Sequence, residues 1–228
     1  MQFVCGGYTR PMHPAITRLF PSTVHVSECS DPALVEPLFP EEEAAIARAV
    51  EKRKVEFALG RTAARAALRA LGVAPGPLVA QPDRSVGWPG EAWGSITHAD
   101  GICLAAAVRR SDHAGVGIDA ELRERVRQDL WSHIATEREI AWFRDGTDER
   151  EARARATLLF SAKETFYKAQ FCVSRAWVGF HDAELTFGAD GTFEVRLLVD
   201  VGDAFAREAR FHGRSCLLDR HVVTGMVV

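Results

Sequence analysis

The chain has 228 residues, which is enough for one large domain or for two of about 110 residues each. Apolar residues make up 47% and charged residues 26% of the sequence, so a disordered chain is excluded and a globular fold is expected. The formal net charge of −3 gives the chain no overall attraction to nucleic acid or to an anionic membrane surface.

No segment of the sequence predicts contact with a membrane. The first residues lack the charged-then-apolar layout of a signal peptide, and no apolar run approaches the roughly 20 residues of a membrane helix. We therefore expect a cytoplasmic protein. The cysteines are odd in number and include no C-x-x-C pair, which argues against a metal or redox site built from them. We expect buried free thiols at Cys5, Cys29, Cys103, Cys172 and Cys216.

The first part of the chain is predicted to hold one long helix after a short strand at Thr23–Val26. The helix begins at Pro40, because the three glutamates that follow suit a helix N-terminus, and it stops at Gly72, a typical C-terminal residue. Residues 75–89 are proline-rich loop, and residues 91–108 indicate two short strands around a turn.

The second part continues the mixture of helices and strands after a linker at 109–115. Its predicted elements are a strand at 116–122, helices at 126–145 and 151–171, and strands at 183–187, 192–200 and 221–228. The sequence therefore predicts a mixed α/β fold in two similar halves, each with a helix and short strands, divided near 111–115.

Two carboxylates stand near the end of the strand predicted in VGIDAEL. Side chains alternate along a strand, so Asp119 and Glu121 share one face while Ile118 and Ala120 point into apolar packing. Converging carboxylates of this kind suit magnesium. Alternatively, the strand runs into a solvated loop, ELRERVR, in which the acidic residues pair with arginines.

The helix in LLFSAKETFYKA carries a cluster of charges. Lys163, Glu164 and Lys168 bring two cations and one anion to an otherwise apolar helix, as a site for phosphate and metal requires. Glu164 and Lys168 are four residues apart, so an ordinary helical ion pair is the alternative. Ser161 and Glu164 also fit a capping box, although Leu158–Phe160 already read as helix and argue against a start there.

The first long helix has arginines on its buried side. The apolar seam of this helix comprises Val50, Phe57, Ala64, Leu68 and Leu71. Arg61 falls within this seam and Arg53 at its edge. Either the long side chains extend to water, or both guanidinium groups reach a bound polyanion, which their geometry suits.

A turn in GSITHADG places His98 among small polar residues. A lone histidine in a loop is more often a surface residue than a catalytic one. With the hydroxyl and backbone N–H of Thr97, however, His98 can complete a short anion-binding corner. The glycines of GVG at 115–117 do not form a dinucleotide-binding fingerprint, because the third glycine of the G-x-G-x-x-G pattern is missing and because a strand, not a helix, follows them.

Taken in order, KRKVEFALGRTAAR, PDRSVGWP, GSITHADG, VGIDAE and FSAKETFYKA resemble the motifs of the larger, surfactin-type class of 4′-phosphopantetheinyl transferases. The resemblance runs from about Leu38 to Phe187 and is closest to the enterobactin-type and actinobacterial branch. Such enzymes move the phosphopantetheine arm of coenzyme A to a serine of an acyl or peptidyl carrier protein, release 3′,5′-ADP and require magnesium. The resemblance implies two α/β subdomains related by a pseudo-twofold, at 1–112 and 113–228, with the coenzyme between them.

The resemblance, together with the motifs above, also assigns roles to residues. The implied magnesium ligands are Asp119, Glu121 and Glu164, and the implied catalytic residues are Glu164, Lys168 and His98. The implied coenzyme-binding residues are Arg53, Arg61, Arg84, Ser85, Val86, Gly87, Thr97, His98, Asp119, Lys163 and Lys168. Of these, the loop at 84–87 is expected beside the adenine nucleotide, and Glu164 is the candidate acceptor of the serine proton.

Two other functions share parts of this pattern: a magnesium-dependent phosphohydrolase, and a non-catalytic protein that binds nucleotide or a carrier domain. Arg53, Arg61 and His98 suit a 3′-phosphate and argue against the hydrolase, and the three intact carboxylates argue against a non-catalytic binder. We expect a monomer with coenzyme A and carrier proteins as partners, without nucleic acid or membrane, in a natural-product pathway such as siderophore or polyketide synthesis.

Overall fold

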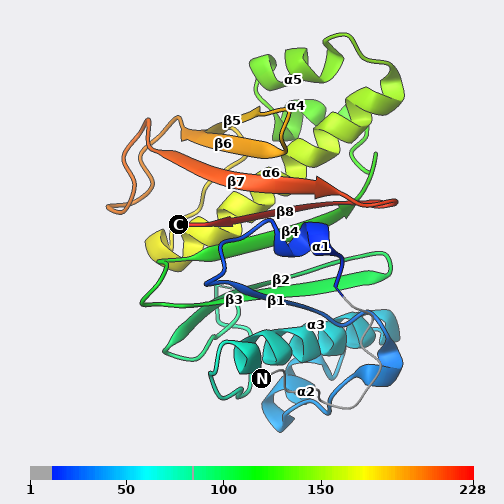
Figure 1. Ribbon diagram of the computed structural model, residues 1–228, viewed down its shortest axis with the longest axis vertical. Coiled ribbons are helices and arrows are strands. Elements are labelled where there is room, and N and C mark those ends of the chain that lie inside the picture. Colours follow the sequence, from blue (N-terminus) through cyan, green and yellow to red (C-terminus); the bar gives the residue numbers. More distant parts are fainter. Residues whose placement is uncertain (1–11, 84) are drawn as a thin grey trace.

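The computed structural model describes residues 12–83 and 85–228. Within these residues the chain forms two antiparallel sheets, of three strands in the order β1-β3-β2 and of five strands in the order β4-β8-β7-β6-β5. Helix α3 packs on the first sheet, and α6 packs on β4 and β8 of the second (Figure 1). The mixed α/β fold predicted from the sequence is confirmed.

The first half runs from α1 to β3. Its elements are α1 (Pro14–Thr17), β1 (His25–Glu28), a short 3-10 helix (Pro32–Leu34), α2 (Pro40–Ile46), α3 (Glu51–Ala70), β2 (Ala92–Ala99) and β3 (Ile102–Arg109). β2 and β3 form the predicted hairpin, and Gly101 supplies the positive φ of 83° that its turn requires. The first strand begins two residues later than predicted.

The helix predicted to run unbroken from Pro40 is two helices. α2 ends at Ile46 and α3 begins at Glu51, so the prediction of a continuous helix is wrong over residues 47–50. Val50 was expected in the buried seam, but it is the extended, exposed residue that precedes α3. Phe57 and Leu68 of the same seam are buried, as predicted. No proline or glycine marks the break, so it is tertiary packing that separates α2 from α3.

The second half contains a strand, a group of helices and four further strands. Its elements are β4 (Val116–Leu122), a 3-10 helix (Gln128–Leu130), α4 (Trp131–Ile134), α5 (Glu137–Arg144), α6 (Glu149–Ser174), β5 (Ala183–Phe187), β6 (Thr192–Leu197), β7 (Arg210–Leu217) and β8 (His221–Val227). The helix predicted at 126–145 is divided because Thr136 and Glu139 form a capping box that starts α5. β7 was not predicted, since its sequence RFHGRSCL lacks an alternating apolar pattern.

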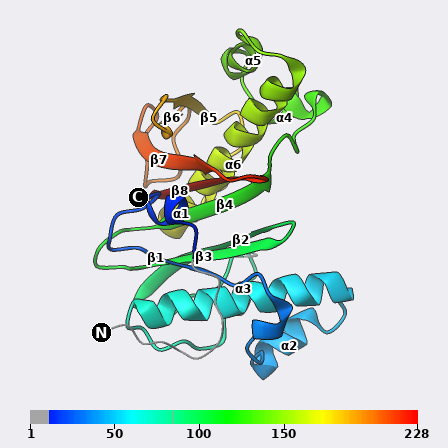
Figure 2. The ribbon, with the colours of Figure 1, turned by 45° about the vertical axis from the view of Figure 1, so that its right-hand side comes forward.

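Strand β4 joins the two halves (Figure 2). It is an edge strand of the second sheet, paired there with β8, and its other edge meets β2. Hydroxyl groups of β2 take the place of a neighbouring strand: the N–H of Ile118 donates to Ser95 Oγ at 3.1 Å, and the N–H of Ala120 donates to Thr97 Oγ1 at 3.0 Å. An apolar cluster that includes Leu104 of β3 and Ile118 fills the rest of the joint.

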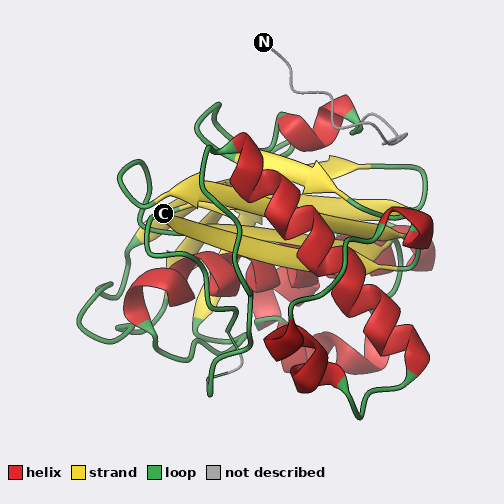
Figure 3. Ribbon diagram, turned by 90° about the horizontal axis from the view of Figure 1, so that it is seen from below, coloured by secondary structure: helices red, strands yellow, loops and turns green. Residues whose placement is uncertain are grey.

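Two glycines bring α6 against β4. A Cβ atom on Gly117 would overlap the carbonyl oxygen of Thr165, and one on Gly115 would overlap the carbonyl oxygen of Ala169. The glycines of GVG therefore serve close packing of strand and helix. At the opposite end of the molecule from α5, α3 crosses the first sheet, and the view from below shows it in front of the strands (Figure 3).

The free thiols are confirmed for the described cysteines. Cys29 and Cys103 are buried, whereas Cys172 and Cys216 are only partly buried, and Cys5 lies outside the described residues. Among the helices of the described chain, none combines the length and the apolar character needed to cross a membrane.

Candidate active site

Asp119 lies at the junction of β4, β2 and α6 and is 5% exposed. Its Oδ1 accepts hydrogen bonds from Lys168 Nζ at 2.7 Å and from Thr97 Oγ1 at 3.2 Å. Its Oδ2 is buried and has no hydrogen-bond partner among residues 12–83 and 85–228. A buried carboxylate oxygen without a partner is unfavourable, so this atom indicates a place for a ligand or ion.

Two further carboxylates accompany Asp119. Glu121 follows it on the same face of β4, and Arg125 Nη1 donates to Glu121 Oε2. Burial raises the pKa of Glu121, against the hydrogen bond from Arg125. Glu164 lies one turn before Lys168 on α6, and its side chain makes no hydrogen bond or ion pair with the described residues. Burial raises the pKa of Glu164 as well, against the attraction of Lys168.

The structure realises part of each interpretation of the acidic pair. Glu121 pairs with an arginine of the following loop, as the solvated-loop alternative expects, whereas Asp119 pairs with Lys168 from α6. The ordinary helical ion pair between Glu164 and Lys168 is not formed within the described chain. In this conformation, no group of three or more His, Cys, Asp and Glu side chains among the described residues is arranged to hold a metal ion. The observation that fits a cation is the unpartnered Oδ2 of Asp119.

A basic corner from the first half lies near these carboxylates. Arg53 Nη1 is 3.1 Å from His98 Nε2, so the arginine donates to a neutral imidazole. Burial lowers the pKa of His98, and the positive charges of Arg53 and Lys168 lower it further, while Glu56 opposes them. Both side chains of the pair are about half exposed. They are therefore open to a solvent-borne anion.

The side chains of Arg61 and Thr97 are held by contacts within the protein that the sequence did not suggest. Arg61 is 6% exposed, its Nε donates to the carbonyl of Leu78 at 2.7 Å, and its guanidinium lies 4.0 Å from the centre of the Phe57 ring. Burial lowers the pKa of Arg61 to about 10. The side chain thus does not extend to water. The hydroxyl of Thr97 is likewise engaged, between Asp119 and the backbone of β4.

Lys163 is not brought to the site. Its buried Nζ donates to Glu139 Oε2 at 2.8 Å and to the carbonyl of Phe180 at 2.5 Å. Burial lowers the pKa of Lys163, against the attraction of Glu139. Lys163 and Lys168 are five positions apart in the sequence, which turns their side chains roughly 140° apart around α6. Lys163 therefore holds α5 to α6, while Lys168 faces β4.

A pocket of about 380 Å³ opens beside Lys168, between β2, α6 and the loop before β2. Ser85 and Val86 line it, and Asp83 Oδ1 accepts from the N–H and hydroxyl of Ser85 at 2.9 and 2.6 Å. The N–H of Gly87 donates to the carbonyl of residue 79 at 2.9 Å, which closes the loop. Arg84 lies outside the described residues.

The aromatic wall of this pocket and Arg175 were not predicted from the sequence. The aromatic residues are Trp88, Trp93, Tyr167, Phe171 and Trp177. Tyr167 and Phe171 are four apart on α6, a spacing that could have been read, but the tryptophans come from other segments that only the fold brings together. Arg175, which lies 3.9 Å from Asp83 across the pocket, was not predicted, whereas Arg125 was expected only as one of the arginines of the loop ELRERVR.

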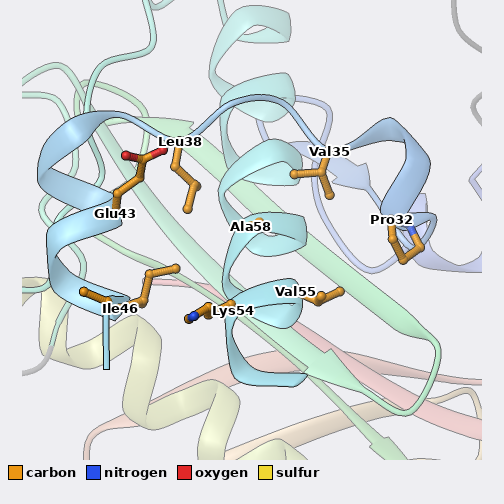
Figure 4. Close-up of a pocket in the computed structure, with 9 residues that line it drawn as sticks. Pro32, Val35, Leu38, Glu43, Ile46, Lys54, Val55 and Ala58 are labelled. Carbon is orange, nitrogen blue, oxygen red and sulfur yellow. The ribbon is translucent and has the colours of Figure 1, made fainter. Parts of the chain in front are cut away.

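A second pocket, of about 520 Å³, lies on the first half between α2, α3 and the preceding loop (Figure 4). Its lining is mainly apolar, with Val35, Leu38 and Ile46 drawn from the loop and α2, and Glu43 and Lys54 are its charged members. Among the described residues that line it, none is a predicted site residue. The chemistry is therefore assigned to the region around Asp119.

Comparison with known proteins identifies the family of the chain. The family model described as the 4′-phosphopantetheinyl transferase N-terminal domain matches residues 41–108, and the 4′-phosphopantetheinyl transferase superfamily model matches residues 115–224. The chain is 39% identical to the 4′-phosphopantetheinyl transferase Svp of Streptomyces mobaraensis over 193 residues, which are 84% of this chain and 78% of Svp. The chain belongs to the 4′-phosphopantetheinyl transferase family.

Other members of the family are similar over comparable or shorter lengths. The 4′-phosphopantetheinyl transferase PptT of Mycobacterium tuberculosis is 37% identical over 191 residues, 80% of this chain and 81% of PptT. Enterobactin synthase component D of Salmonella typhi is 35% identical over 143 residues, 59% of this chain and 55% of that protein. The resemblance found in the sequence is thus confirmed. This transferase is an enzyme that moves phosphopantetheine from coenzyme A to carrier proteins.

Proposed function

We propose that this transferase works at the junction of β4, β2 and α6, with magnesium held by Asp119, Glu121 and Glu164. The observation that carries the proposal is Asp119 Oδ2, a buried carboxylate oxygen without a partner in the described chain. Carboxylate oxygens are the ligands that magnesium takes. When bound, the ion would neutralise charge on the pyrophosphate of the coenzyme.

We also propose that the two halves, 1–112 and 113–228, are related by a pseudo-twofold and supply different parts of the site. Arg53 and His98 from the first half are open to solvent, and Arg61 belongs to the same helix as Arg53. Burial lowers the pKa of Arg61, and the charge of Arg53 lowers it further, against the attraction of Glu42. Cations gathered in this way favour a bound polyanion. They would hold the coenzyme's 3′-phosphate, while the acidic ligands come from the second half.

The residues of this chain account for the remaining steps. Lys168 is fixed by Asp119 and by the carbonyl of Ile118, at 3.1 Å, so its charge is in place before the reaction and would offset charge on the departing 3′,5′-ADP. Glu164 has no competing ion pair in the described chain, and it would accept the proton of the carrier serine as the serine oxygen bonds to phosphorus.

The aromatic pocket would bind the parts of the coenzyme other than its phosphates. It lies beside Lys168, and its walls are mainly apolar, as expected of a site for a small molecule. Ser85, Val86 and Gly87 would lie beside the adenine nucleotide, at the edge of this pocket.

We propose that the partners are acyl or peptidyl carrier proteins of a natural-product or siderophore pathway. The similarity to Svp and to enterobactin synthase component D supports this choice. A cytoplasmic monomer remains the expected state of the enzyme.

Mass spectrometry of an apo carrier protein tests the proposal. Incubated with this enzyme, coenzyme A and magnesium, the carrier should gain one phosphopantetheinyl group, and a chelator should prevent the gain. Asp119→Asn should behave as the chelated enzyme does. Release of 3′,5′-ADP from coenzyme A without a carrier would instead support the phosphohydrolase.

A further inference from the structure

Asp119 and Glu121 share a pattern in how their oxygens are used. Asp119 Oδ1 is held by Lys168 and Thr97, and its Oδ2 has no partner. Glu121 Oε2 is held by Arg125, and its Oε1 accepts no hydrogen bond from the described residues. In each carboxylate, then, a cation fixes one oxygen and the other oxygen stays available.

We propose that Arg125 is a positioning residue of the metal site, which fixes the carboxylate of Glu121 so that Oε1 is free for the ion. This inference rests on the proposed function, because it requires Glu121 to be a metal ligand. Ligating carboxylates in metal sites are themselves hydrogen-bonded, and loss of such an outer partner typically weakens metal binding about 10- to 100-fold.

The turn that carries Arg125 is anchored on both sides. The N–H of Arg125 donates to the carbonyl of Leu122 at 3.2 Å, which folds the chain back over the end of β4. Glu124 is bound to α6, since Arg150 Nε donates to its carboxylate at 2.8 Å and Arg153 Nη2 donates to its carbonyl at 2.7 Å. The side chain of Arg125 therefore starts from a fixed backbone position.

The pair differs from an ordinary surface ion pair. The side chain of Arg125 is 60% exposed, but that of Glu121 is 9% exposed, so the arginine reaches inward to a buried acid. Two residues further on, Arg127 pairs with Asp129 at 2.8 Å, and both of these side chains are exposed. Exposed ion pairs of that kind contribute little to the stability of a protein. Arg127 is therefore a matched control.

Titration of the magnesium-free enzyme with Mn²⁺ tests the proposal, because Mn²⁺ takes the same oxygen ligands as Mg²⁺ and its free form is counted by electron paramagnetic resonance. Arg125→Gln should weaken Mn²⁺ binding about 10- to 100-fold. Arg125→Lys should restore part of it, and Arg127→Gln should leave it unchanged. In the transfer assay, the magnesium concentration for half-activation should rise by the same factor, with kcat at saturating magnesium retained.

Glu121→Gln separates failure of this inference from failure of the proposed function. If Glu121→Gln loses Mn²⁺ binding while Arg125→Gln binds as tightly as the parent or more tightly, Arg125 is a mere counter-ion and the inference is overturned. If Glu121→Gln binds Mn²⁺ as the parent does, the metal assignment fails, and the inference fails with it. Thermal unfolding of each variant establishes that the comparison is between folded proteins.

Discussion

Glu42 in the first half and Asp119 in the second are both buried carboxylates, but their oxygens are used differently. Glu42 Oε2 accepts hydrogen bonds from Arg65 and from the N–H of Phe39, and its Oε1 accepts one from the N–H of Leu78 at 2.8 Å. Asp119 keeps one oxygen without a partner in the described chain. A fully satisfied carboxylate indicates a part of the fold, and an incompletely satisfied one indicates a site for a ligand.

The position of Glu42 also explains the break between α2 and α3. Its carboxylate joins three segments: its own helix α2, α3 through Arg65, and the segment at Leu78 that leads to the pocket loop. A continuous helix would carry Glu42 along the axis of α3 and away from both partners. The buried carboxylate of Glu42 therefore has a structural role in the first half.

The largest effect is expected for Asp119→Asn. An amide is a poor substitute for a carboxylate ligand, so kcat/KM for transfer should fall by about three orders of magnitude or more. Kinetics at saturating magnesium, with urea unfolding of the same samples, measures this. Asp112→Asn, on the exposed linker, should retain activity. Near-normal turnover of folded Asp119→Asn would place the metal elsewhere.

Glu42→Gln should instead act on stability. The amide group places a donor among the donors of Arg65 and Leu78, so the free energy of unfolding should fall by about 3–5 kcal/mol. Urea unfolding measures this loss. Glu43→Gln, one residue further and exposed, is the control and should change little. A loss as small as that of the control would remove the contrast between the two buried acids.

Arg53→Ala should act on coenzyme binding. Charge-assisted hydrogen bonds contribute about 1.5–3 kcal/mol, so KM for coenzyme A should rise roughly 10- to 100-fold, while KM for 3′-dephospho-coenzyme A should change far less. Arg61→Ala should show the same selectivity together with lower stability, because its Nε is bound to Leu78. Lys54→Ala, where the parent lysine pairs with Glu51, is the control. Equal changes for both substrates would leave Arg53 and Arg61 as structural residues.

The smallest effect is expected for Asp83→Asn. It weakens the contact with Arg175 across the pocket, an exposed pair at 3.9 Å, so KM for coenzyme A should rise a few-fold at most, and less at high salt. Asp190→Asn alters a similar turn, in which Asp190 accepts from Thr192, without touching the pocket. If both variants behave alike, the contact with Arg175 plays no part in binding.

Local patterns in the sequence predicted the elements that carry the site. Strand alternation placed Asp119 and Glu121 on one face, and helical spacing placed Glu164 and Lys168 together. Contacts with residues distant in the sequence determined the other features of the site. The pattern did not show which lysine faces β4, because that depends on the acceptor Glu139 and on the glycines that bring α6 against the strand.

The break after α2 and the burial of Arg61 depend on long-range contacts in the same way. Glu42 meets Leu78 across 36 residues, and Arg61 meets the same segment across 17. Neither contact leaves a periodic mark in the sequence. The sequence shows only that Arg61 falls in an apolar seam, whereas the fold places the carbonyl of Leu78 where Arg61 can donate to it.

The hydroxyl contacts between β2 and β4 have a mechanical consequence. Within each sheet the strands are held by ladders of backbone hydrogen bonds, whereas the two halves meet at β4 through Ser95 and Thr97. If the halves part, Asp119 keeps Lys168, which belongs to the same half, and loses Thr97. The amide hydrogens of Ile118 and Ala120 therefore report this opening by their rate of exchange with solvent, and a coenzyme bound across the joint should slow both.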